Sequence, residues 1–87
     1  MDKPRVMAAV RTALSEVQAN YGDDAIWYLL PAVETYLVEA GVEIDIDSCE
    51  LEEAIEESEY PENTVAVIDG CVVTVDLETN RIEIVDG

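Results

Sequence analysis

Residues 43–62 read EIDIDSCELEEAIEESEYPE and separate a helical N-terminal part of the 87-residue chain from a strand-rich C-terminal part. Ten of these twenty residues are Asp or Glu, and none is Lys or Arg. A protein that is acidic only for solubility would distribute its carboxylates over the chain, because a dense block of like charge repels itself. The block therefore indicates that the negative charge itself has a use.

Two amphipathic helices are expected before the acidic block. The first spans residues 3–20, where apolar side chains recur at spacings of one, three and four, and Pro4 suits its first turn. The second spans residues 24–40, is apolar around most of its circumference, and precedes Gly41, which suits a left-handed C-cap. Pro31 lies inside it and is expected to kink or restart the helix. This second helix either is central to the fold or also meets a partner.

The rest of the chain predicts strands and one short helix. Residues 42–47 alternate between apolar and acidic side chains, which predicts a half-buried strand with an outer face of carboxylates. Asp47 and Glu50 have capping-box spacing, so a short helix is expected from there to about residue 59. Three strands should follow, and the first two flank an Asp-Gly hairpin turn. The expected strands span residues 65–68, 71–76 and 81–85.

Together these elements predict a single α+β domain over residues 1–87. Two long N-terminal helices should pack on a three- or four-stranded antiparallel sheet, with a short acidic helix between them. The sheet would have four strands if residues 42–47 joined it, and their carboxylates would then form a rim continuous with the short helix.

The charge balance excludes several classes of function. The net charge is -17, and residues 12–80 contain no Lys or Arg. Direct binding to nucleic acid or to an anionic membrane is therefore not expected. The chain has no apolar run of about 20 residues and no signal-peptide pattern, so a cytoplasmic protein is expected. Cys49 and Cys71 should then be reduced thiols, with a single disulfide as the alternative.

The sequence also lacks the common motifs of enzyme active sites. The chain has no histidine, no glycine-rich phosphate loop and no nucleophile elbow, so neither an enzyme nor a cofactor is expected. The acidic residues from Asp45 to Glu56 partly match a calcium-binding loop. Glu50 occupies the position where such a loop needs glycine, so no specific metal site is predicted.

In size, charge and acidic clustering, the chain resembles the small acidic nucleic-acid mimics that phages and mobile elements use against restriction, repair or CRISPR systems. The resemblance implies a non-enzymatic inhibitor that occupies the basic groove of a nucleic-acid-binding protein. The row of carboxylates would make the contacts, and Tyr60 or Trp27 would supply an aromatic anchor. The predicted partner-binding residues are Glu43, Asp45, Asp47, Glu50, Glu52, Glu53, Glu56, Glu57 and Tyr60.

Two other interpretations fit the composition. A salt-adapted domain from a halophilic organism would also be acidic and poor in lysine, although the polar face of the first helix is not acidic. An acidic module that binds a basic protein could in addition form a homodimer through the apolar helix surface of residues 27–38.

Overall fold

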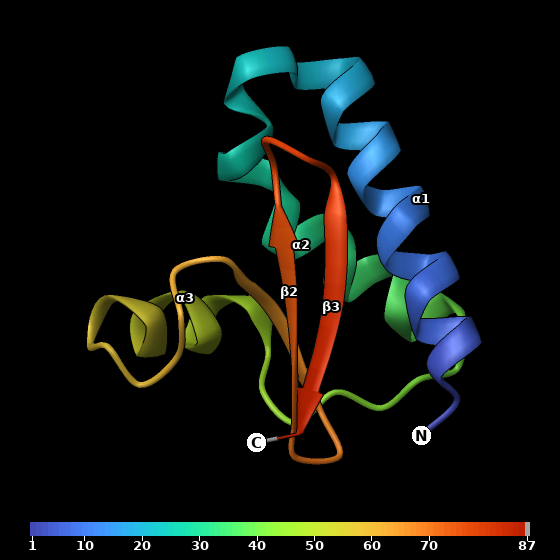
Figure 1. The fold of residues 1–87 in the computed structure, drawn as a ribbon, viewed down its shortest axis with the longest axis vertical. Helices are drawn as coiled ribbons and strands as arrows, with labels where there is room; N and C mark the ends of the chain where they lie inside the picture. The colour runs from blue at the N-terminus through green and yellow to red at the C-terminus, as the bar shows by residue number, and fades with distance from the viewer. Residues whose placement is uncertain (87) are drawn as a thin grey trace.

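The computed structural model describes residues 1–86, which form an α+β fold (Figure 1). The three strands make one antiparallel sheet in the order β1-β2-β3. The predicted α+β class and the three-stranded sheet are thus confirmed. In chain order the elements are α1 (Lys3–Tyr21), the 3-10 turn η1 (Gly22–Asp24), α2 (Ala25–Glu39), α3 (Ser48–Glu56), β1 (Thr64–Ile68), β2 (Cys71–Asp76) and β3 (Arg81–Asp86).

The N-terminal part is helical almost without interruption from residue 3 to residue 39. The Asp2 side chain caps α1 by accepting a hydrogen bond from the Arg5 N–H, and Gly22 ends the helix with a φ of 55°. Helix α1 has 19 residues and is long, whereas α2, which follows the 3-10 turn η1, has 15. The prediction of two long helices is therefore right only in part. The helix α2 runs through Pro31 without restarting.

A Schellman motif ends α2 and directs the chain toward the sheet. Gly41 has a φ of 79°, and its N–H donates to the Val38 carbonyl at 3.0 Å. The Val42 N–H donates to the Leu37 carbonyl, also at 3.0 Å. This pair of bonds satisfies two carbonyls that the helix end would otherwise leave free, and it confirms the expected left-handed cap.

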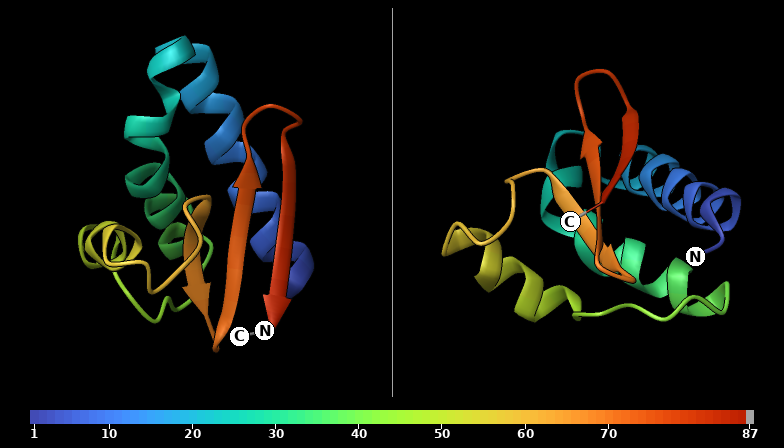
Figure 2. Two further views of the ribbon diagram at one scale, coloured as in Figure 1. Left: turned by 60° about the vertical axis from the view of Figure 1, so that its left-hand side comes forward. Right: turned by 60° about the horizontal axis from the view of Figure 1, so that its bottom comes forward.

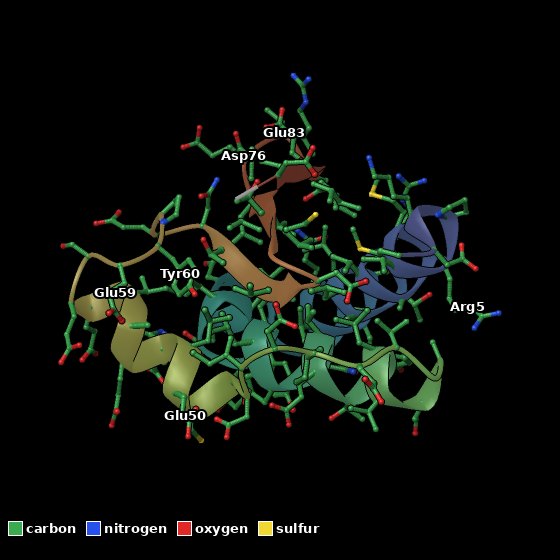
Figure 3. All side chains as sticks on the ribbon, turned by 90° about the horizontal axis from the view of Figure 1, so that it is seen from below. Arg5, Glu50, Glu59, Tyr60, Asp76 and Glu83 are labelled. Atoms are coloured by element: carbon green, nitrogen blue, oxygen red, sulfur yellow. The ribbon has the colours of Figure 1, made fainter. Side chains whose placement is uncertain are left out.

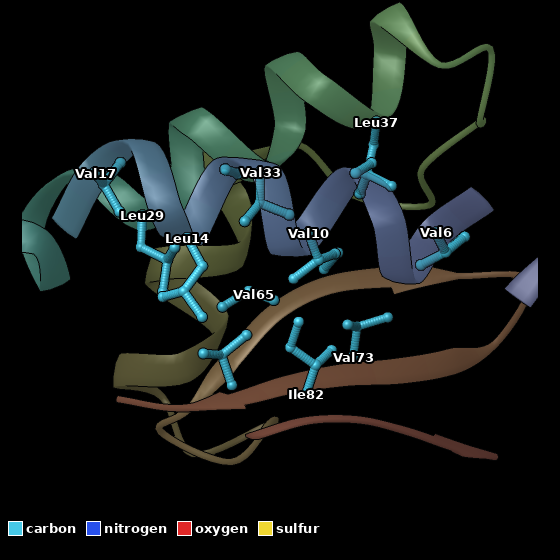
Figure 4. Packing of buried hydrophobic residues seen from close by; sticks show 14 of the residues in the cluster. Val6, Val10, Leu14, Val17, Leu29, Val33, Leu37, Val65, Val73 and Ile82 are labelled. Atoms are coloured by element: carbon cyan, nitrogen blue, oxygen red, sulfur yellow. The ribbon is translucent and has the colours of Figure 1, made fainter. Parts of the chain in front are cut away.

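The core lies between the two N-terminal helices and one face of the sheet (Figure 4). Helix α1 contacts β3, and α2 contacts β1. Every residue of β1 is buried although it is an edge strand, because α3 also contacts it. The largest fully buried core side chains are Leu37, Ile68, Val6, Val10, Val33 and Val73.

The hairpin regions follow the sequence closely. Asp69 and Gly70 both have positive φ, at 51° and 78°, as a two-residue hairpin turn requires. Asn80 has a φ of 58° in the turn between β2 and β3. Ile82 pairs with Val75 and is buried, while Ile84 is half-buried.

Residues 42–47 do not form the predicted strand. Their alternation is present, since the apolar side chains are half-buried and the acidic ones are exposed. The segment is held beside β1 by one backbone bond, from the Asp45 N–H to the Val67 carbonyl at 2.8 Å. The Asp45 carboxylate accepts hydrogen bonds from the N–H groups of Asp69 and Gly70, at 3.3 and 2.9 Å. These contacts fix the segment at the hairpin turn in place of a continuous ladder.

The short acidic helix is also shorter than predicted. It ends at Glu56, with Glu57 as its C-cap, and not near residue 59. Ser58 follows with a φ of 64°, and its N–H donates to the Ile55 carbonyl at 3.0 Å. A left-handed residue at this position closes a helix, so the chain leaves α3 there.

Candidate partner-binding surface

We call residues 43–62 the acidic segment. All ten of its acidic side chains are exposed. They include every carboxylate that the sequence predicts to contact a partner, whereas Tyr60 is half-buried. Glu50 and Glu59 project from α3 and the loop behind it, and Tyr60 lies nearer the body of the protein (Figure 3). The acidic segment therefore offers its charge to solvent along its whole length.

Two of the predicted carboxylates also stabilise the fold. Asp45 binds the hairpin turn, and Asp47 caps α3 by accepting a hydrogen bond from the Glu50 N–H at 2.8 Å. The Glu34 side chain of α2 accepts a second bond at this helix end, from the Ser48 N–H at 2.6 Å. These bonds satisfy N–H groups at the start of α3, and an acidic residue there also interacts favourably with the helix dipole.

Helix α3 presents its carboxylates on two sides. Glu52 and Glu56 are one turn apart and face α2, where they line a hollow between the two helices. Glu53 and Glu57 are also one turn apart and are exposed as well, but they do not line that hollow. We call Glu52 and Glu56 the inner pair and Glu53 and Glu57 the outer pair. The buried residues Leu51 and Ala54 hold the helix against the protein.

In the described part of the chain, no basic side chain forms an ion pair with the acidic segment. Among residues 1–86, the side-chain ion pairs join Arg5 to Asp2 at 3.6 Å and Arg81 to Glu83 at 2.9 Å. Neither pair involves residues 43–62. Arg5 lies on the opposite side of the molecule from Glu59 in Figure 3. Salt bridges within the described residues therefore leave the field of the acidic segment uncompensated.

The hollow between α2 and α3, here called the α2–α3 groove, has a volume of about 320 Å³. Its apolar side includes Ile26 and Trp27, which are 58% and 74% exposed. Its acidic side includes the inner pair together with Glu62. The groove thus places an exposed tryptophan directly beside carboxylates.

A second hollow of about 430 Å³ adjoins this groove and shares Ile26, Leu30 and Glu62 with it. Asp76, the last residue of β2, and Glu78, in the turn that follows, add two more acidic residues to its edge. Among residues 1–86, no Lys or Arg lines either hollow. The two hollows together form one surface with an apolar floor and a rim whose charged residues are all acidic.

The two cysteines are free thiols in different surroundings. Cys49 is exposed and lines the α2–α3 groove. Cys71 is half-buried, and its Sγ donates a hydrogen bond to Asp86 Oδ1 at 3.2 Å. This bond to a carboxylate, with some burial and the negative charge of Asp86, raises the pKa of the Cys71 thiol. Cys71 is therefore expected to be the less reactive thiol.

No protein-family model, curated protein or solved structure matches this chain. Within residues 1–86, no helix has the length and apolar character needed to cross a membrane. In the same residues, no three Cys, Asp or Glu side chains converge in a way that could hold a metal ion.

Sequence reasoning identified Trp27 only as an alternative anchor and missed the groove beside it. The sequence feature that could have pointed to the groove is that residues 24–40 are apolar around most of the helix. The fold buries only one stripe of this helix, so other apolar side chains remain exposed. That stripe consists of Ala25, Leu29, Val33 and Leu37. The pairing of α2 with α3 that makes the groove depends on tertiary structure.

Proposed function

We propose that the protein is a non-enzymatic inhibitor whose acidic segment occupies the basic groove of a nucleic-acid-binding protein. The observation that supports this proposal is the set of ten exposed carboxylates, none of which forms an ion pair within residues 1–86. Concentrated negative charge of this kind attracts a basic partner strongly and over a long range.

The shape of the protein suits this role. Helix α3 stands at the side of the molecule, beyond the β1 edge of the sheet and away from α1 (Figure 2). Its convex surface carries carboxylates about 5 to 6 Å apart at helical spacings of three and four residues. Nucleic-acid phosphates follow one another at about 3.4 Å of axial rise and lie further apart along the winding backbone. A groove lined with Lys and Arg can therefore accept either the carboxylates of α3 or the phosphates of a nucleic acid.

The proposed partner belongs to the machinery that phages and mobile elements counter, such as CRISPR or restriction complexes. Such complexes hold nucleic acid in positively charged channels, which would attract an acidic protein. The proposal places the protein in the cytoplasm of the host cell, where it meets this partner directly and without nucleic acid as a bridge.

Capture from a host lysate tests the proposed function. We expect the tagged protein to retain one nucleic-acid-processing complex, identified by mass spectrometry, that nuclease treatment does not remove and that added DNA displaces. Displacement by DNA is expected because both ligands would occupy the same basic groove. A diffuse set of basic proteins that all dissociate together at moderate salt would contradict mimicry and leave a generally acidic surface.

The salt-adapted interpretation makes a different prediction. Lys3, Arg5 and Arg11 are exposed on α1, so the acidic residues do not cover the whole surface as salt adaptation would favour. We expect a single cooperative thermal transition in dilute buffer, followed by circular dichroism, with only a modest rise in midpoint in molar salt. Unfolding in dilute buffer that molar salt reverses would support the salt-adapted domain instead.

A further inference from the structure

We propose that the α2–α3 groove binds an amphipathic basic segment of the partner protein, whose apolar side chain packs on Trp27 while its Lys or Arg side chains contact the acidic rim. This inference rests on the proposed function, because the segment belongs to the same basic partner. It adds a defined pocket to what would otherwise be a contact between two charged surfaces.

The apolar side of the groove is unusual for such a charged protein. Trp27 and Ile26 are 74% and 58% exposed, although α2 already buries a complete stripe of its own against the core. Tryptophan is enriched among the residues that contribute most to binding energy at protein interfaces. An apolar side chain of the partner would remove Trp27 and Ile26 from water together.

The acidic side of the groove selects the charge of the occupant. Glu52, Glu56 and Glu62 lie beside the apolar floor, and Asp76 and Glu78 extend the rim along the adjoining hollow. A Lys or Arg side chain can place its methylene stem along an apolar surface and its charged end on a carboxylate. The face of Trp27 also favours a cation near it. A helical segment with apolar residues on one face and basic residues beside them satisfies both sides of the groove.

A second copy of the chain does not suit this groove. Each copy carries a net charge of -17, and a symmetric contact through α2 and α3 would bring two acidic rims together. Like charges placed opposite one another disfavour association. The homodimer expected through residues 27–38 would therefore need to avoid this end of α2.

Two synthetic peptides of equal charge test the inference. One is a helix-forming peptide of Leu and Lys, and the other replaces each Leu by Gln. Trp27 is the only tryptophan of the chain, so its fluorescence reports on the groove alone. We expect the Leu-Lys peptide to shift the Trp27 emission to shorter wavelength and to bind at least about tenfold more tightly than the Gln-Lys peptide.

Thiol alkylation gives an independent measurement in the same experiment. Cys49 lines the groove and should be protected by the Leu-Lys peptide, whereas Cys71 lies elsewhere and serves as the internal reference. Equal affinity for both peptides, or an unchanged alkylation rate at Cys49, would overturn the inference. A blue shift of Trp27 that depends on protein concentration without peptide would also overturn it and indicate self-association.

The inner and outer pairs of α3 supply matched variants. Glu52→Lys with Glu56→Lys and Glu53→Lys with Glu57→Lys each raise the net charge by four, in α3 and its C-cap. We expect the inner-pair variant to weaken binding of the Leu-Lys peptide about tenfold or more, and the outer-pair variant by less than about threefold. An equal loss in both variants would show that only the total charge matters, which contradicts a groove site.

This experiment separates the inference from the proposed function. The peptides need no knowledge of the natural partner, so their failure to enter the groove would leave capture of a nucleic-acid-binding complex unaffected. Conversely, the Leu-Lys peptide could bind in the groove while the lysate yields no complex that DNA displaces. That result would support the groove site and contradict nucleic-acid mimicry.

Discussion

Replacing Leu37 with alanine is expected to lower the free energy of unfolding by about 2 to 5 kcal/mol. Leu37 is completely buried in the core between α2, α1 and the sheet. Truncating it removes apolar contacts and leaves a cavity that the surrounding side chains can fill only in part. Its carbonyl also accepts the Val42 N–H at the end of α2, so the cavity would lie where the helical layer leads into the acidic segment.

Urea unfolding followed by circular dichroism measures this change, and Val38→Ala is the matched control. Val38 is the next residue of the same helix but is 59% exposed, so its truncation should change the free energy of unfolding by less than about 0.5 kcal/mol. A domain of 87 residues has a total stability of roughly 4 to 13 kcal/mol. Equal effects of the two substitutions would contradict the core described above.

The sequence was informative wherever a local pattern determines the structure. Apolar spacing located α1 and α2, Gly41 marked the end of α2, and Asp69 with Gly70 marked the hairpin. Each of these features depends on residues close together in the chain, such as a helix face or a residue that tolerates positive φ. The α+β class follows from their order along the chain.

The sequence-based predictions are wrong where the structure depends on contacts between residues far apart in the chain. Residues 42–47 alternate as a strand does, and alternation alone cannot distinguish a ladder from an extended segment held at two points. The Asp45 carboxylate forms one of those attachments, with hairpin amides more than twenty residues away. Glu34 likewise reaches the start of α3 from another helix. Neither contact leaves a periodic signal in the sequence.

One part of the candidate site could be recognised from the sequence and the other could not. The acidic segment could be identified from composition, and the structure leaves all its carboxylates exposed. The groove could not be identified, because it forms only when Trp27 of α2 and Glu52 of α3 become neighbours. Charge density along the chain is therefore the basis on which we propose a basic partner, while the groove that we propose for an apolar side chain could be recognised only in the tertiary structure.

Reversing the outer pair, with Glu53→Lys and Glu57→Lys, is expected to weaken binding to the captured nucleic-acid-processing complex by about a hundredfold. Two carboxylates that attract basic residues of the partner would then repel them, and close interfacial charge pairs contribute about 1.5 kcal/mol or more each. A total of about 3 kcal/mol corresponds to two factors of ten in the dissociation constant. Both side chains are exposed on the outer face of α3.

The matched control is Glu16→Lys with Glu39→Lys, which makes the same change in net charge at exposed positions outside the acidic segment. Interferometric binding assays at one ionic strength should show a loss below about threefold for this control, because distant charges are screened within about a Debye length. The outer-pair variant should melt no earlier than the parent protein, since lysines near the C-terminal end of α3 interact favourably with the helix dipole and with the glutamates that remain in the acidic segment. Equal losses of affinity in the two variants would mean that the partner senses only total charge. A loss confined to the outer pair, and reduced at higher salt, would instead place the partner's basic groove around α3.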